Sequence, residues 1–275
     1  MDFLASLADY AFLRNALFGG LLASAACGLM GPYVVVRRIG YVAGGIAHSV
    51  LGGMGLAYFL GGSPIWGALA AALAAAMVIG WVSLRASEQE DTLIGAVWAV
   101  GMAAGIMFIT QTPGYNADLM SYLFGSILLI PDRDLWLLAS LVGLMGLVVA
   151  LFYKQFLAIA FDPEFARIRG VRVELMYLLL LCLVALTVVV LVQVVGLILV
   201  IALLTLPAAL AARFVRSLFA MMVIATILGM IFTTSGLAVS FQRDLPAGAT
   251  IILIAGSVYF IVSLAGPLTR RIGSR

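Results

Sequence analysis

Residues 175–212 read LMYLLLLCLVALTVVVLVQVVGLILVIALLTLPAALAA, a run of 38 residues without a charged side chain. A membrane-spanning helix needs about 20 apolar residues, so this stretch is long enough for two helices. Gln193 and Gly196 lie near its middle and mark the expected break between them. Across the whole chain 65% of residues are hydrophobic and 10% are charged, whereas soluble domains carry roughly 25% charged residues. The sequence therefore predicts an all-α, polytopic integral membrane protein in a lipid bilayer.

Further uncharged runs have the length of a membrane span. They are 15–36, 39–61, 65–84, 92–111, 135–153, 218–241 and 247–268. With two helices in 175–212 the expected number is eight to nine transmembrane helices. The apolar piece 119–130 is too short to cross a bilayer, so we expect it to form one short re-entrant or partial segment. Residues 1–275 are expected to form a single transmembrane domain.

The basic residues test this topology, because Lys and Arg collect on the cytoplasmic side of membrane proteins. With nine spans and the N-terminus outside, only Arg14, Arg133 and Arg243 of the 15 basic residues fall outside. If 119–130 crossed the bilayer, only five would lie inside, and a single span over 175–212 would give eight inside and seven outside. The nine-span arrangement is therefore preferred.

The only histidine of the chain lies in the stretch Tyr41–Gly53, which reads YVAGGIAHSVLGG. Two adjoining helical stripes in this stretch carry small residues: Gly44, His48 and Gly52 on one, and Gly45, Ser49 and Gly53 on the other. Small residues let helix backbones approach closely in a bilayer. We therefore expect an inner helix whose imidazole points into protein or a cavity. A polar group at this depth is a candidate for function, although a backbone carbonyl can also satisfy a lone imidazole.

Other kinds of chemistry find little support. Cys27 and Cys182 lie in apolar runs, where cysteine is usually a small core residue, and one histidine with two distant cysteines cannot build a four-ligand zinc site. The motifs HExxH and GxSxG do not occur, so we expect no enzyme activity. A P-loop needs a lysine after its glycines, but the only lysine, Lys154, has no glycine near it. The chain cannot hydrolyse ATP itself, and its small net charge of +3 gives no reason to expect nucleic acid.

Two cytoplasmic stretches are candidate docking surfaces. In FDPEFARIRGVRVE (Phe161–Glu174), Asp162 before Pro163 is a good N-cap, three apolar side chains form a stripe, and Gly170 ends the predicted helix. In LPAALAARFVRS (Leu206–Ser217), Pro207 is expected to interrupt the long apolar run. The alternative for a short amphipathic helix here is that it lies on the lipid surface.

Six stretches occur in an order that resembles a known family. They are VVVRRIGYVAGGIAHSVLGGMGLAYFLG, EDTLIGAVWAVGMAAGIMFI, DLMSYLFG, FDPEFARIRGV, VVGLILVIALLTLPAALAARF and LPAGATIILIAG. Together, from about Leu21 to Gly266, they resemble the permease subunit of ABC importers for zinc and manganese. The later half is also distantly similar to permeases that import cobalamin and iron–siderophores.

The resemblance implies a bacterial inner-membrane permease that pairs with a second copy of itself. It also implies a cytoplasmic ATP-binding subunit and an extracellular or periplasmic metal-binding protein as partners. Its main coupling surface would lie in Leu206–Ser217, with Phe161–Arg172 as a second surface. The residues implied are Pro207, Arg213, Arg216 and Ser217, then Asp162, Glu164 and Arg167, with Ser49, Asp118, Tyr122 and Gly125 along the pathway or its outer entrance.

The chain departs from the family at the histidine. Many members read G-D-A-x-S-H, with an aspartate one helical turn before the histidine, but here Gly44 and Ala47 replace the aspartate and the serine. We expect His48 to remain a metal ligand, either as a weak relay point or paired with His48 of a second copy. Because imidazole suits zinc, Zn²⁺ is the expected cargo ahead of manganese or iron, with no resident cofactor. The alternatives are a stand-alone transporter driven by an ion gradient, for which Asp118 is the only intramembrane carboxylate candidate, and a non-transporting scaffold.

Overall fold

The computed structural model describes residues 3–85, 90–112, 130–197 and 200–272, and the elements in these ranges are all helices. They are α1 (Phe3–Asp9), α2 (Ala11–Arg37), α3 (Gly40–Phe59), α4 (Pro64–Ser83), α5 (Glu90–Gln111), α7 (Asp132–Phe161), α8 (Pro163–Ile168), α9 (Val173–Val195), α10 (Val200–Phe214), α11 (Leu218–Arg243) and α12 (Ala247–Ile272). Most of the expected segment 119–130 lies outside the described residues.

The membrane spans follow the sequence prediction closely. Within the described ranges, 8 helices are long and apolar enough to cross a membrane, and α10 is a shorter apolar helix of 15 residues. This confirms an all-α, polytopic membrane fold. The predicted break is also confirmed, because α9 ends at Val195 and Gly196 follows with a φ of 79°, a conformation that glycine adopts without strain.

One expected break is wrong. Pro207 does not interrupt the chain, since α10 runs through it from Val200 to Phe214. A proline inside a helix removes one backbone hydrogen bond, but tight packing within a membrane domain compensates for this loss. Pro207 is itself buried, together with Leu204 and Ala208 on either side of it.

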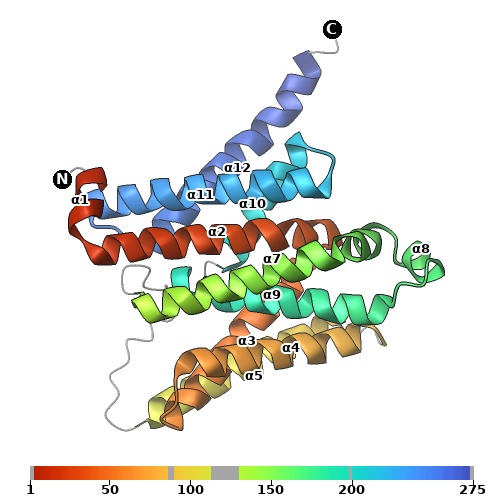
Figure 1. The fold of residues 1–275 in the computed structure, drawn as a ribbon, viewed down its shortest axis with the longest axis horizontal. Helices are drawn as coiled ribbons and strands as arrows, with labels where there is room; N and C mark the ends of the chain where they lie inside the picture. Colours follow the sequence, from red (N-terminus) through yellow and green to blue (C-terminus); the bar gives the residue numbers. More distant parts are fainter. Residues whose placement is uncertain (1–2, 86–89, 113–129, 198–199, 273–275) are drawn as a thin grey trace.

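The two ends of the bundle separate the functional regions. Helix α8 and the turn between α10 and α11 lie at one end, on the right of Figure 1. The N-terminus, the start of α7 and the end of α11 lie at the other end. This arrangement agrees with the basic-residue prediction, in which Arg14, Arg133 and Arg243 share the outer side.

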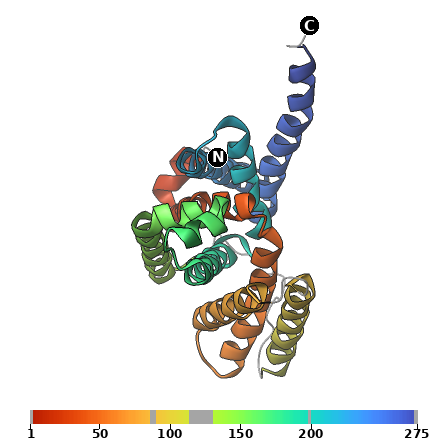
Figure 2. The ribbon, with the colours of Figure 1, turned by 90° about the vertical axis from the view of Figure 1, so that its right-hand side faces the viewer.

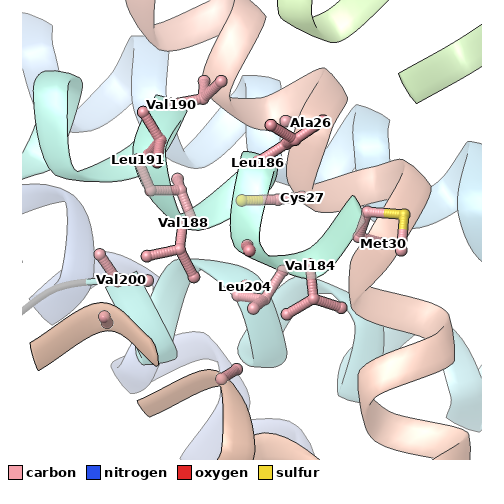
Figure 3. Close-up of a cluster of buried hydrophobic side chains, with 14 of the residues drawn as sticks. Ala26, Cys27, Met30, Val184, Leu186, Val188, Val190, Leu191, Val200 and Leu204 are labelled. Atoms are coloured by element: carbon pink, nitrogen blue, oxygen red, sulfur yellow. The ribbon is translucent and has the colours of Figure 1, made fainter. Parts of the chain in front are cut away.

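Helices α2 and α9 form the centre of the bundle. The most apolar windows of α9 and α2 are 78% and 67% buried, compared with 17% for α5 and α7. Valine and leucine side chains of α9 pack against Ala26, Cys27 and Met30 of α2 and against Leu204 of α10 (Figure 3). Helices that are apolar on every side are expected in such a position. Cys27 is buried as predicted, and Cys182 is half-buried.

Helices α3, α4 and α5 form a group at one side of the bundle, whereas α12 projects from the opposite side (Figure 2). Glycines bring the backbones of α3 and α5 together. A Cβ on Gly52 would lie 2.8 Å from the carbonyl oxygen of Gly101, and a Cβ on Gly101 would lie 2.6 Å from the Cα of Ser49. The expected close packing through small residues is therefore present, and it places α5 directly beside the histidine.

Candidate functional site

His48 lies near the middle of α3 and faces α5. Its imidazole stacks on the indole of Trp98, with 3.9 Å between ring centroids and an angle of 10° between the planes. The histidine is half-buried. Ser49 is buried in the α3–α5 contact, and its hydroxyl donates a hydrogen bond of 2.7 Å to the carbonyl oxygen of Ile46. Of these two neighbouring polar residues, His48 is therefore the one left free to bind a ligand.

The two ring nitrogens of His48 are not equivalent. Nδ1 is buried and has no hydrogen-bond partner within the described part of the chain, so no backbone carbonyl satisfies it there. A buried N–H without an acceptor costs about 1–3 kcal/mol, which favours the neutral tautomer with its proton on Nε2. When an ion binds Nε2, this proton must move to Nδ1, which has no hydrogen-bond acceptor in the described part of the chain. A site built on this nitrogen alone is therefore weak.

Apolar neighbours surround Gly44, the position at which the resemblance implies an aspartate. A Cβ on Gly44 would lie 2.9 Å from Cδ1 of Ile201 in α10 and 3.6 Å from Cζ3 of Trp98. Across the described ranges, no group of three or more His, Cys, Asp and Glu side chains is close enough to hold a metal ion. Within the described part of one copy of the chain, His48 is therefore the candidate metal ligand at this site.

Sequence reasoning missed Trp98 and Ile201. Each lies on a helix far from α3 in sequence, and only the packing of α5 and α10 brings it to His48. Another set of expected residues, Asp118, Tyr122 and Gly125, lies outside the described residues.

Helix α8 forms the first of the two surfaces that the sequence predicts to be cytoplasmic. Asp162 caps it as predicted, because its side chain accepts a hydrogen bond of 2.9 Å from the backbone N–H of Phe165. The apolar side chains of Phe161, Phe165 and Ile168 are 63%, 50% and 84% exposed. Glu164 and Arg167 are also exposed, and Arg167 forms an ion pair with Glu174 of α9.

The turn between α10 and α11 forms the second of these predicted surfaces. Arg213 donates a hydrogen bond of 3.3 Å to the carbonyl oxygen of Val262 in α12. Ser217 caps α11 by accepting a hydrogen bond from the backbone N–H of Ala220. Arg216 is exposed. Pro207 is buried, so it can shape this surface but cannot touch a partner itself.

A polar cavity of about 420 Å³ connects α8 with the base of the histidine-bearing helix. Arg37, Tyr41, Asp91 and Arg167 are among its lining residues. Tyr41 belongs to α3, and its ring lies 6.3 Å from that of Trp98. Tyr41 thus lines the cavity beside α8 and also lies beside Trp98, which stacks on His48.

Comparison with known proteins agrees with this architecture. The fold and the relatives define the chain as a multi-pass permease of the bacterial membrane that serves an ABC metal importer. Residues 9–266 match the ABC 3 transport family, and the chain belongs to that family.

Individual relatives cover most of the chain. An uncharacterized membrane protein of Synechocystis sp. is 48% identical over 94% of this chain and 91% of its own length. The manganese transport system membrane protein MntC of Halalkalibacterium halodurans is 32% identical over 96% of this chain and 91% of its own. The solved structure of PsaBC from Streptococcus pneumoniae in complex with Fab aligns with a TM-score of 0.86 at 31% identity, covering 94% of this chain and 93% of that chain.

Proposed function

We propose that this permease imports zinc, with manganese and iron as poorer cargo. The observation that carries this proposal is the single imidazole of His48, which faces α5 and, among the described residues, has no carboxylate grouped with it to hold a metal. Imidazole suits zinc, whereas carboxylate and carbonyl oxygens suit manganese. The name of the relative MntC indicates that manganese is the metal transported by that system. The donors at His48 favour zinc here, because Gly44 removes the oxygen ligand that would favour the harder ion.

A weak site suits a conduit, because an ion must leave as readily as it enters. The proposed transporter contains two copies of this chain, each supplying one His48 to the pathway. Metal reaches it from an extracellular or periplasmic binding protein. Nε2 does not need to hold the ion for long, and the absence of an acceptor for Nδ1 in the described part of the chain weakens the bond, so that release is easy.

The energy comes from separate ATP-binding subunits in the cytoplasm. They dock on α8, whose exposed apolar stripe is flanked by Glu164 and Arg167, and on the turn that carries Arg213, Arg216 and Ser217. Exposed apolar side chains in a cytoplasmic segment are typical of an interaction surface. Arg167 of α8 and Tyr41 of α3 line the same cavity, so a movement of α8 can reach α3 by closing it.

The test is transport by the purified complex in proteoliposomes. The chain is reconstituted with its ATP-binding subunit and loaded metal-binding protein, and uptake of radiolabelled zinc is followed with and without ATP. Uptake that requires ATP and is competed weakly by Mn²⁺ supports the proposal. Uptake by the chain alone under a proton or sodium gradient would instead establish the secondary-transporter alternative. Preferential uptake of manganese would overturn the zinc assignment and leave the rest intact.

A further inference from the structure

The side chain of Trp98 packs against that of His48, the candidate metal ligand. Its position on a membrane helix does not by itself require this contact. Its indole lies flat on the His48 ring rather than turning outward like Trp66, Trp81 and Trp136, which are 59%, 53% and 79% exposed. Aromatic pairs that are offset and nearly parallel attract each other beyond their apolar burial. The stack therefore fixes the plane of the imidazole.

This contact matters because the usual way of orienting a metal-binding histidine is missing. Such a histidine almost always donates its second ring N–H to a carboxylate, a carbonyl or a water, and this bond holds the ring in place. Nδ1 of His48 has no such partner in the described part of the chain, and the family's aspartate is replaced by Gly44. Packing against neighbouring side chains must therefore orient the imidazole of His48.

Trp98 is itself held in place. The ring of Tyr41 lies 6.3 Å from it on the cytoplasmic side, and the close backbone contact at Gly101 fixes α5 against α3 one turn further along. A metal ion binds an imidazole in the plane of the ring. An indole on the face of the ring therefore leaves Nε2 open while it prevents the ring from rotating.

We propose that Trp98 is a positioning residue for the transported ion: its stack on His48 performs the orienting task that a hydrogen-bonded carboxylate performs elsewhere. This inference rests on the proposed role of His48 in metal transport. It predicts that aromatic stacking at position 98, rather than volume alone, sets the affinity of the site for zinc.

The experiment uses the fact that the chain has one histidine. The assembled complex, with histidine in this chain alone labelled with an NMR-active nitrogen isotope and with its purification tag removed, is titrated with zinc while both ring nitrogens are observed. Trp98→Leu removes the stack and Trp98→Phe keeps it, while Trp136→Leu, at an exposed site on α7, is the matched control. Size-exclusion chromatography verifies assembly of each variant.

Trp98→Leu should weaken zinc binding about tenfold, the lower end of the loss seen when an orienting partner of a metal ligand is removed. Trp98→Phe and Trp136→Leu should bind like the wild type. Adding Gly44→Asp should restore much of the zinc affinity that Trp98→Leu loses, because the carboxylate supplies a second ligand to the ion. Wild-type affinity in Trp98→Leu, or an equal loss in Trp98→Phe, would overturn the positioning role. If zinc leaves the His48 signals of the wild type unchanged, the ligand role of His48 fails first, and the inference fails with it.

Discussion

Replacing Gly44 by aspartate gives His48 a carboxylate neighbour and tests why the site is weak. Residues four apart on a helix have Cβ atoms about 5–6 Å apart, so the carboxylate and the imidazole can hold one ion together. The new Cβ would lie 2.9 Å from Cδ1 of Ile201 and 3.6 Å from Cζ3 of Trp98. The closer atom is the end of a flexible side chain, which can move by a few tenths of an ångström.

Two effects of opposite sign follow from Gly44→Asp. An aspartate at the centre of a membrane helix costs about 2.5–3.5 kcal/mol, and Gly44 lies one turn from the cytoplasmic end of α3, so the metal-free variant is destabilised by less than this. An added carboxylate ligand should raise the metal affinity at least as much as an outer-shell partner of the histidine does, about 10–100-fold, which corresponds to about 1.4–2.8 kcal/mol. The gain should be larger for Mn²⁺ than for Zn²⁺, since manganese prefers oxygen ligands.

Competition with a metal-sensitive fluorescent chelator measures both affinities on the purified complex. Gly44→Asn is the matched control, because it adds nearly the same volume without the charge. The expected result is tighter binding of both ions in Gly44→Asp, a higher ratio of manganese to zinc affinity, slower release and a lower turnover. Unchanged affinities in Gly44→Asp, with binding still lost in His48→Ala, would refute the reasoning about the missing carboxylate.

Three further results are expected. Thermal unfolding should show that Gly101→Ala destabilises the chain by about 1–3 kcal/mol through overpacking. The new Cβ would lie 2.6 Å from the Cα of Ser49. The control Gly143→Ala, which has open space around it, should be neutral or stabilising. Asp162→Ala should lose about 1 kcal/mol of helix-capping stability and reduce transport-coupled ATP hydrolysis, whereas Asp162→Ser should retain this activity. Equal ATP hydrolysis by the wild type and both variants would contradict a role for the cap. Ile168→Asp should weaken binding of the ATP-binding subunit in a pull-down assay while zinc still binds at His48, and undiminished binding would remove α8 from the docking surface.

The membrane architecture follows from sequence because a bilayer imposes simple local rules. Span length, charge at the helix ends and the glycine at position 196 were sufficient to predict the helices and the break after α9. The N-cap at Asp162 was predictable for the same reason, since capping depends on neighbours in sequence. Pro207 misled the prediction because its effect on a helix depends on what packs around it, and local sequence does not contain that information.

The surroundings of His48 show the limit of sequence reasoning more clearly. Helical spacing placed Gly44 and His48 on one face, and the small residues indicated close packing with another helix. Spacing could not identify that helix, so neither Trp98 on α5 nor Ile201 on α10 was foreseen. Both lie against Gly44, the position at which the resemblance implies an aspartate, and contacts between distant segments decide what surrounds that position.

The most direct measurement of the central claim is the initial rate of ATP-driven zinc uptake by proteoliposomes that contain wild-type or His48→Leu complexes. Both complexes must contain equal amounts of the ATP-binding subunit. The account predicts that uptake falls by more than about tenfold in His48→Leu while the complex still assembles, because losing a ligand should cost at least as much as losing one of its outer-shell partners. Equal uptake by the two complexes would contradict a metal pathway that passes through His48.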